Sequence, residues 1–131
     1  MAQCLEDSRM TNYILDKNSA SVDASTATIP SDRLFRSAWV LNGSVITEDL
    51  ETAKTLFKDA IRKARQPLLE AEDVVYMKAL EASDSSAQSA SVTKKTALRD
   101  APAAQAITNA TTIDELKAAW DTSLLGTSPY A

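Results

Sequence analysis

The chain has 131 residues and a formal net charge of −4, enough for one modest domain with tails. Aromatic residues make up only 5% of it and there are two glycines, which argues against a β-sandwich or an α/β fold with its many strands and glycine turns. The acidic balance argues against an electrostatic grip on nucleic acid. We therefore expect a mainly α protein with a thin core and no nucleic-acid partner.

The residue types present also restrict the chemistry. The chain contains no histidine, which removes Ser-His-Asp and Cys-His nucleophile systems and most zinc sites. An enzyme would have to work with carboxylates, lysine or tyrosine alone. Glu70, Glu72 and Asp73 cluster, but nothing near them in the sequence would complete a metal site. We find no phosphate-binding loop, Rossmann glycine pattern or nucleophile elbow, and expect no catalytic residue, cofactor or metal.

Hydropathy gives no sign of a membrane protein. No window approaches 18 apolar residues, and residues 1–11 lack the apolar core of a signal peptide. We expect no membrane partner.

Residues 1–28 predict an extended N-terminal arm. Residues 1–9 have no hydrophobic period, and a short apolar run at residues 13–15 is compatible with an edge strand. Residues 18–28 are rich in Ser, Ala and Thr, a composition typical of a polar linker.

Residues 29–46 predict a turn followed by a small β-hairpin. Asn42-Gly43 lies between two apolar runs and is a strong signal for a type I′ hairpin turn, in which both central residues have positive φ. An isolated hairpin is marginally stable, so this one must pack on something. Phe35 and Trp39 are its expected anchors, either in the core of the protein or against a partner.

Residues 47–82 predict one long helix, around which the rest of the chain is organised. Thr47 can cap its start. The apolar side chains fall within about a third of the helix circumference at 100° per residue. They are Leu50, Ala53, Phe57, Ala60, Ile61, Ala64, Leu68, Ala71, Val75, Ala79 and Ala82.

Pro67 lies inside this helix. The apolar stripe stays in phase across it, which favours a kinked helix over a helix pair broken at Pro67 and folded back, although both remain open. A continuous helix of about 50 Å would be longer than a compact domain of this chain length, so it would have to project and pack on something else. Val74, Met77 and Leu80 lie off the main stripe and could make such a contact.

Residues 83–121 predict shorter C-terminal helices, and residues 122–131 predict a tail. After a polar break, a helical pattern resumes at Val92 and ends near Asp100, because Pro102 disfavours helix at the residue before it.

A capping box starts the next helix. Thr112 and Glu115 have its T-x-x-E spacing, which predicts a helix from Ile113 to about Asp121 with Trp120 as its packing residue.

Charged residues beside Pro102 suggest a link between the helices. Arg99 and Asp100 are adjacent there, and Arg62, Arg65 and Asp73 offer partners on the long helix. A bidentate Arg–carboxylate pair could staple the C-terminal segment to that helix. The alternative is a set of exposed charges contributing less than about 1 kcal/mol.

The same segments resemble the tail-assembly and tail-fibre-assembly proteins of tailed bacteriophages. In those families an R-x-x-R-x-x-L-L-x-x-x-D segment precedes one that ends A-L-R-D-x-P. The corresponding segments here are Arg62-x-x-Arg65-x-x-Leu68-Leu69-x-x-x-Asp73 and Lys94-Lys95-x-Ala97-Leu98-Arg99-Asp100-Ala101-Pro102. An upstream segment resembles one found beside it in phage proteins: Pro30-Ser31-Asp32-Arg33-Leu34-Phe35-Arg36-Ser37-Ala38-Trp39-Val40-Leu41-x-Gly43.

The resemblance covers about residues 29–121 and has two departures. Val74 stands where the family has an aromatic residue, and residues 94–96 replace a Tyr-Arg pair.

The resemblance implies a non-enzymatic structural component of a tailed-phage virion, associated with the tail or tail fibre and assembled in the bacterial host cytoplasm. It would dock onto other phage structural proteins and self-associate. The departures leave open an assembly chaperone that acts in the host cytoplasm and is absent from the mature particle. The residues we assign to these interactions are Phe35, Arg36, Trp39, Val74, Met77, Leu80, Arg99 and Asp100.

Overall fold

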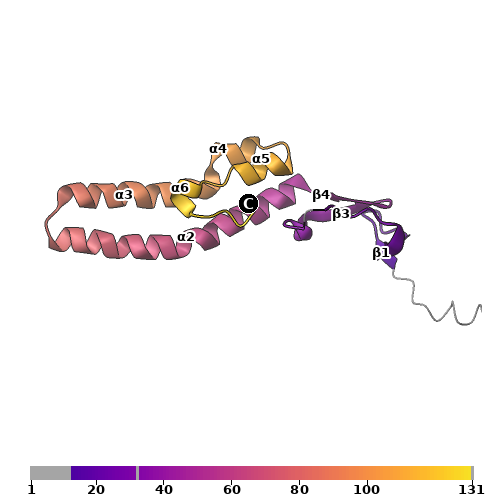
Figure 1. Ribbon diagram of the computed structural model, residues 1–131, viewed down its shortest axis with the longest axis horizontal. Helices are drawn as coiled ribbons and strands as arrows, with labels where there is room; N and C mark the ends of the chain where they lie inside the picture. The colour runs from indigo at the N-terminus through magenta and orange to yellow at the C-terminus, as the bar shows by residue number, and fades with distance from the viewer. Residues whose placement is uncertain (1–12, 32, 131) are drawn as a thin grey trace, which may run out of the picture. The chain divides into compact units, whose positions relative to one another are not determined.

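The computed structural model describes residues 13–31 and 33–130. The chain forms two compact units, an N-terminal unit that ends at Asp49 and a C-terminal unit that begins at Leu50. The fold is mainly α, with a long helix, shorter C-terminal helices and a small antiparallel β region near the N-terminus, as the sequence predicts (Figure 1). The predictions for residues 1–12 fall outside the described residues.

The predicted hairpin is present, but its turn is displaced by one residue. Strands β3 (Trp39–Asn42) and β4 (Val45–Glu48) pair antiparallel, so the two turn residues are Gly43 and Ser44. Gly43 has a φ of 62°, and no positive φ occurs at Asn42 or Ser44. This is the pattern of a type II′ turn, with glycine at the first central position, and the predicted type I′ turn is wrong.

A second hairpin replaces part of the expected extended arm. Strand β1 (Tyr13–Leu15) pairs antiparallel with β2 (Ser21–Asp23), which the short 3₁₀ helix η1 (Ala24–Thr26) follows. The Asp16 carboxylate organises the loop, because it accepts the backbone N–H groups of Asn18 and Ala20 at 2.9 and 2.8 Å. Composition alone predicts a linker here because it does not show such local hydrogen bonds between side chains and the backbone.

Backbone hydrogen bonds join the β3–β4 hairpin to the loop between β1 and β2, through the Lys17 N–H and the Leu41 carbonyl at 2.9 Å, and to the segment after η1. The Thr28 N–H donates to the Ser44 carbonyl at 2.6 Å, and the Ile46 N–H donates to the Thr28 carbonyl at 2.8 Å. The 3₁₀ helix η2 (Arg36–Ala38) leads into β3. The Asp49 N–H, just after β4, donates a hydrogen bond to the Ala38 carbonyl at 2.7 Å.

Helix α2 (Leu50–Glu81) is continuous over 32 residues and contains Pro67. The alternative of two helices broken at Pro67 is therefore wrong. In Figure 1 the axis of α2 changes direction along its length, as a proline within a helix would cause. Thr47 does not cap this helix, because it pairs with Val40 in the β3–β4 ladder.

The apolar stripe predicts which residues are buried better in the N-terminal half of α2 than in its C-terminal half. Ala53, Phe57 and Ile61 are buried as predicted. Further along, the buried residues are Glu72 and Ala79, whereas Val75 is exposed.

Helix α3 (Ser85–Asp100) begins seven residues before the predicted Val92. The Asp84 carboxylate caps it by accepting the Ala87 N–H at 3.0 Å, and Ser83, with a φ of 54°, reverses the chain. The expected polar break is thus mostly the first two turns of a helix. Helices α2 and α3 lie side by side and antiparallel, so the C-terminal half of α2 is partnered within its own chain (Figure 1).

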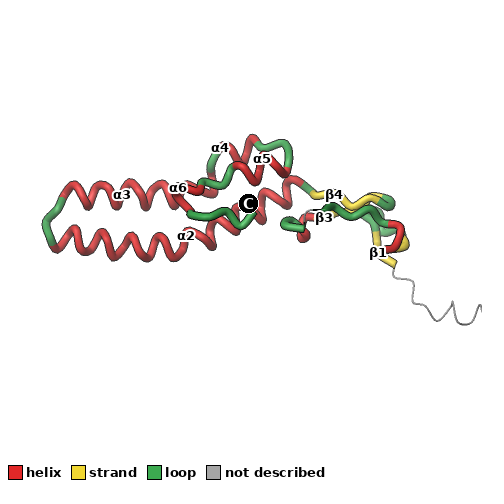
Figure 2. Tube along the Cα trace, in the orientation of Figure 1, coloured by secondary structure: helices red, strands yellow, loops and turns green. Residues whose placement is uncertain are grey.

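Short helices follow α3 and return along α2 (Figure 2). The capping box is confirmed, since the Thr112 hydroxyl accepts the Glu115 N–H at 3.1 Å. The helix that it starts ends at Ala118, before the predicted Asp121, because Asp121 caps the next helix instead. These elements are η3 (Ala101–Ala103), α4 (Gln105–Asn109), α5 (Ile113–Ala118) and α6 (Thr122–Leu125).

Residues 122–130 are packed, and the predicted tail is wrong for this segment. The ring of Tyr130 stacks on Phe57 of α2 at 5.3 Å between centroids, and Trp120 meets Phe57 edge-on at 5.8 Å. The Trp120 indole N–H donates to the Gly126 carbonyl at 3.1 Å. Trp120 is thus the packing residue that the sequence predicts, and this aromatic cluster holds the C-terminal segment on α2.

Candidate interaction surfaces

Two ion pairs contribute to the packing of α3 on α2. Glu72 is buried and forms an ion pair with Lys94 at 3.1 Å, and Asp73 pairs with Lys95 at 2.5 Å. The Lys95 ammonium also lies 5.0 Å from the ring centroid of Tyr76. Glu72 and Asp73 of the acidic cluster therefore pair with lysines of α3, while Glu70 accepts a hydrogen bond from the Gln66 amide at 3.0 Å. Within the described residues, no three His, Cys, Asp or Glu side chains form a candidate metal site.

A second link joins α2 to the end of α3. Arg65 Nη1 donates to the backbone carbonyls of Leu98 and Arg99, at 3.2 and 2.7 Å. The last carbonyls of a helix have no partner within it and carry partial negative charge, so a guanidinium stabilises this end. The expected Arg–carboxylate staple is wrong, because Arg65 links the two helices through backbone carbonyls and not through a carboxylate.

Arg99 and Asp100 do not form the expected staple themselves. Both side chains are exposed, and neither forms an ion pair with another residue in the described part of the chain. Pro102, two residues further on, is buried. The motif therefore divides into a structural part, centred on Arg65 and Pro102, and two solvent-facing charges.

Three predicted interaction residues form an apolar stripe on α2, which we call the outer face. Val74, Met77 and Leu80 are spaced three residues apart and are 53%, 53% and 48% exposed. Helical geometry places them roughly opposite Glu72 and Ala79, the residues buried on the α3 side. A shallow groove of about 380 Å³ follows this face and is lined by Asp73, Val74, Met77, Lys78 and Glu81.

The remaining predicted residues lie in the N-terminal unit and differ in exposure. Phe35 is 1% exposed, which corresponds to the core alternative. Trp39 is half-buried, and the exposed Arg36 places its guanidinium carbon 5.8 Å from the Trp39 ring centroid. Trp39 pairs with Glu48 across the hairpin. Of these three residues, Arg36 and part of Trp39 are thus accessible to a partner.

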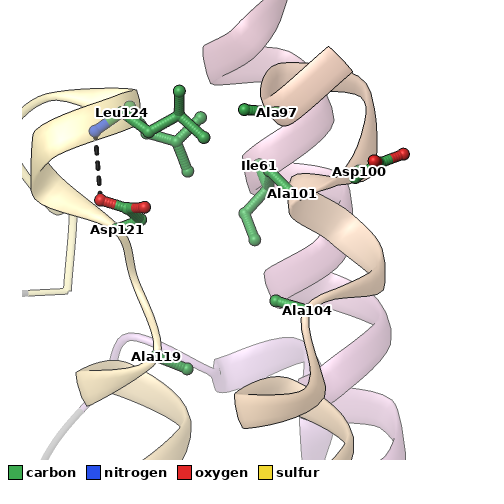
Figure 3. Close-up of a pocket in the computed structure, with 9 residues that line it drawn as sticks. Ile61, Ala97, Asp100, Ala101, Ala104, Ala119, Asp121 and Leu124 are labelled. Carbon is green, nitrogen blue, oxygen red and sulfur yellow. Dashed lines mark hydrogen bonds between the residues drawn. The ribbon is translucent and has the colours of Figure 1, made fainter. Parts of the chain in front are cut away.

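A cavity of about 320 Å³ lies between α2, α3 and α6 (Figure 3). Ile61 and Leu124 border it together with several alanines, while the Asp100 carboxylate points away from it. The other acidic side chain, Asp121, accepts the Leu124 N–H at 3.1 Å. The lining is apolar and offers no arrangement of groups for acid–base or nucleophilic chemistry.

The perturbed ionisable groups serve local structure. Hydrogen bonds from Thr111 lower the pKa of the Glu115 carboxyl, and the Ser123 hydroxyl lowers the pKa of the Asp121 carboxyl. Burial raises the pKa of the Tyr130 phenol. The two acids lie at helix N-termini, where a carboxylate is favoured.

Comparison of the chain with protein-family models, curated proteins and solved structures gives no match. Within its described residues, no helix combines the length and hydrophobicity required to cross a bilayer.

The exposure of Val74, Met77 and Leu80 agrees with their helical spacing away from the main stripe, whereas Val75 belongs to that stripe and is exposed as well. The role of Arg65 could not be predicted, because its acceptors are backbone carbonyls, which every residue has.

Proposed function

We propose that this chain is a non-enzymatic structural component of a tailed-phage virion, associated with the tail or tail fibre. It would assemble in the host cytoplasm and dock onto other virion proteins, including copies of itself. The phage assignment derives from the R-x-x-R-x-x-L-L-x-x-x-D and A-L-R-D-x-P segments. Arg65 of the first segment contacts Leu98 and Arg99 of the second, which supports reading them as parts of one unit.

The observation that carries the docking role is the outer face of α2. Val74, Met77 and Leu80 are each about half exposed although α3 packs on the same stretch of helix. Burying an apolar surface contributes about 25 cal/mol per Å², so an apolar stripe with no cover is a favourable contact for another protein.

The occupant that we propose for the outer face is the same stripe on a second copy of this chain. Val74 and Leu80 lie three residues on either side of Met77. An antiparallel copy would therefore set Val74 against Leu80 and Met77 against Met77, a self-complementary contact of the kind that two-fold dimers use. Asp73 would then face Glu81, but the charge of Asp73 is already compensated by Lys95.

Mass spectrometry of gradient-purified particles tests the virion assignment. We expect peptides of this chain in the particles at a constant ratio to other tail proteins after repeated purification. Presence in infected-cell lysate with loss from purified particles would contradict this and identify an assembly chaperone.

A further inference from the structure

A basic groove lies in the C-terminal unit, where α2 passes the end of α3. It has a volume of about 290 Å³ and is lined by four cations, Lys58, Arg62, Arg65 and Arg99, and by Pro102 and Ala103. Lys58, Arg62 and Arg65 share one face of α2 because they are spaced by four and three residues. Arg99 comes from the last turn of α3.

Only part of this charge is compensated. Arg62 pairs with Asp59 at 2.6 Å, and Arg65 is held by the α3 carbonyls. Lys58 and Arg99 form no ion pair with any residue among 13–31 and 33–130. The groove therefore keeps an excess of positive charge beside a small apolar surface.

The concentration of charge contrasts with the rest of the chain. The protein has 14 basic and 18 acidic residues. Four of the 14 basic residues line this groove, so the rest of the chain has ten basic and 18 acidic residues. Like charges on one groove repel one another, and they are stabilised when a ligand of opposite sign binds.

We propose that this groove binds an acidic peptide segment of a partner protein, with carboxylates on the cations and an apolar side chain against Pro102 and Ala103. Arginine favours this chemistry because its planar guanidinium can bind a carboxylate with two parallel hydrogen bonds. The inference is independent of the proposed function, since a chain that is monomeric or absent from particles would still bind such a segment.

A peptide fits these charges better than a nucleic acid does. Nucleic acids bind along an extended basic track with repeated phosphate contacts. Here the positive charge is confined to one small groove in an otherwise acidic protein, so a polynucleotide would be repelled beyond its first phosphates. A short acidic peptide segment would contact only the groove and would avoid the acidic surface around it.

Fluorescence anisotropy with a labelled octaglutamate peptide tests the inference on the full chain, at low and at physiological salt. We expect binding that weakens with salt, and a loss on the order of tenfold in the variant Lys58→Gln/Arg62→Gln. Lys63→Gln is the matched control, because Lys63 lies on the same helix but lines a different pocket. It should change the affinity by less than about twofold.

Arg99→Gln provides a second variant at an exposed position, so that a folding defect in the double variant does not decide the outcome. It should also weaken binding. Absence of octaglutamate binding at low salt would overturn the proposal, as would an equal loss with Lys63→Gln. Tighter binding of labelled octathymidylate or of inorganic phosphate, measured by competition, would overturn it in favour of a phosphate site.

Discussion

Arg65 of α2 donates a 2.7 Å hydrogen bond to the backbone carbonyl of Arg99, in the last turn of α3. The same guanidinium nitrogen reaches the Leu98 carbonyl at 3.2 Å. One side chain thus fixes the end of α3 against the middle of the long helix. The structural role within the motif belongs to Arg65, while the side chain of Arg99 faces solvent.

The first prediction concerns this contact. Arg65→Met keeps most of the aliphatic stem but removes the donors, and should destabilise the protein by about 1–2 kcal/mol, near the lower end for hydrogen bonds to charged groups because Arg65 is only half-buried. Arg99→Ala should cost less than about 0.5 kcal/mol, as expected for an exposed side chain. Urea unfolding measures both values. A larger loss for Arg99→Ala than for Arg65→Met would show that the assignment is reversed.

The second prediction concerns the buried carboxylate between α2 and α3. Lys94→Met leaves Glu72 buried without its cation and should cost about 1–2 kcal/mol at neutral pH. Adding Glu72→Gln to this variant should recover part of the loss, because a neutral amide is cheaper to desolvate than a charge. Thermal unfolding of the wild type, both single variants and the double variant gives the free energies of unfolding for this double-mutant cycle. No recovery in the double variant would mean that the Glu72 charge is not what Lys94 compensates.

The third prediction concerns the β3–β4 turn. Gly43 has a φ of 62°, and a Cβ placed there would meet nothing within 4 Å, so the cost of Gly43→Val is conformational and not steric. We expect a loss of about 1–3 kcal/mol in the stability of the hairpin. Asn42→Ala should have a smaller effect, since Asn42 is a strand residue without positive φ. Hydrogen exchange of the β3–β4 amides reports the change, and equal effects of the two substitutions would place the turn at Asn42-Gly43 after all.

The fourth prediction concerns acid. The pKa values of Asp121 and Glu115 are lowered in the folded protein from ordinary values of 3.8 and 4.5. Their contribution to stability is therefore complete above these ordinary values and is lost as the pH falls through the lower, folded values. Trp120 directly precedes Asp121, so its fluorescence in a Trp39→Phe background should report loosening of this segment in acid.

Asp121→Asn is the control for the acid experiment. An amide keeps an acceptor oxygen but does not titrate, so this variant should show a weaker acid transition around Trp120. An unchanged transition would mean that Asp121 does not link this segment to pH.

Much of the helical architecture follows from sequence patterns. The spacing of Ala53, Phe57 and Ile61 predicts a long amphipathic helix, and Thr112 with Glu115 predicts the start of α5, because both signals depend on contacts within a few residues. The parts that could not be predicted depend on distant partners. Tyr130 stacks on Phe57 from far along the chain, and nothing near it in the sequence indicates this.

The start of α3 could not be predicted for a different reason. Residues 85–91 are mostly Ser and Ala, which resemble a loop by composition, yet Asp84 caps them and Ser91 donates to the Glu72 carbonyl at 3.2 Å. Small side chains of this kind allow a helix to approach its neighbour closely. The outer face could be found from the sequence because it lies on one helix, whereas the basic groove requires Arg99 to meet α2 in space.

The outer face of α2 is the centre of the proposed role, and sedimentation velocity tests it most directly. The full chain at micromolar concentration should sediment as a concentration-dependent oligomer. The variant Met77→Glu, changed at an exposed position, should sediment as a monomer with unchanged helicity by circular dichroism. Wild-type protein that stays a monodisperse monomer with full helicity across this concentration range would contradict the account.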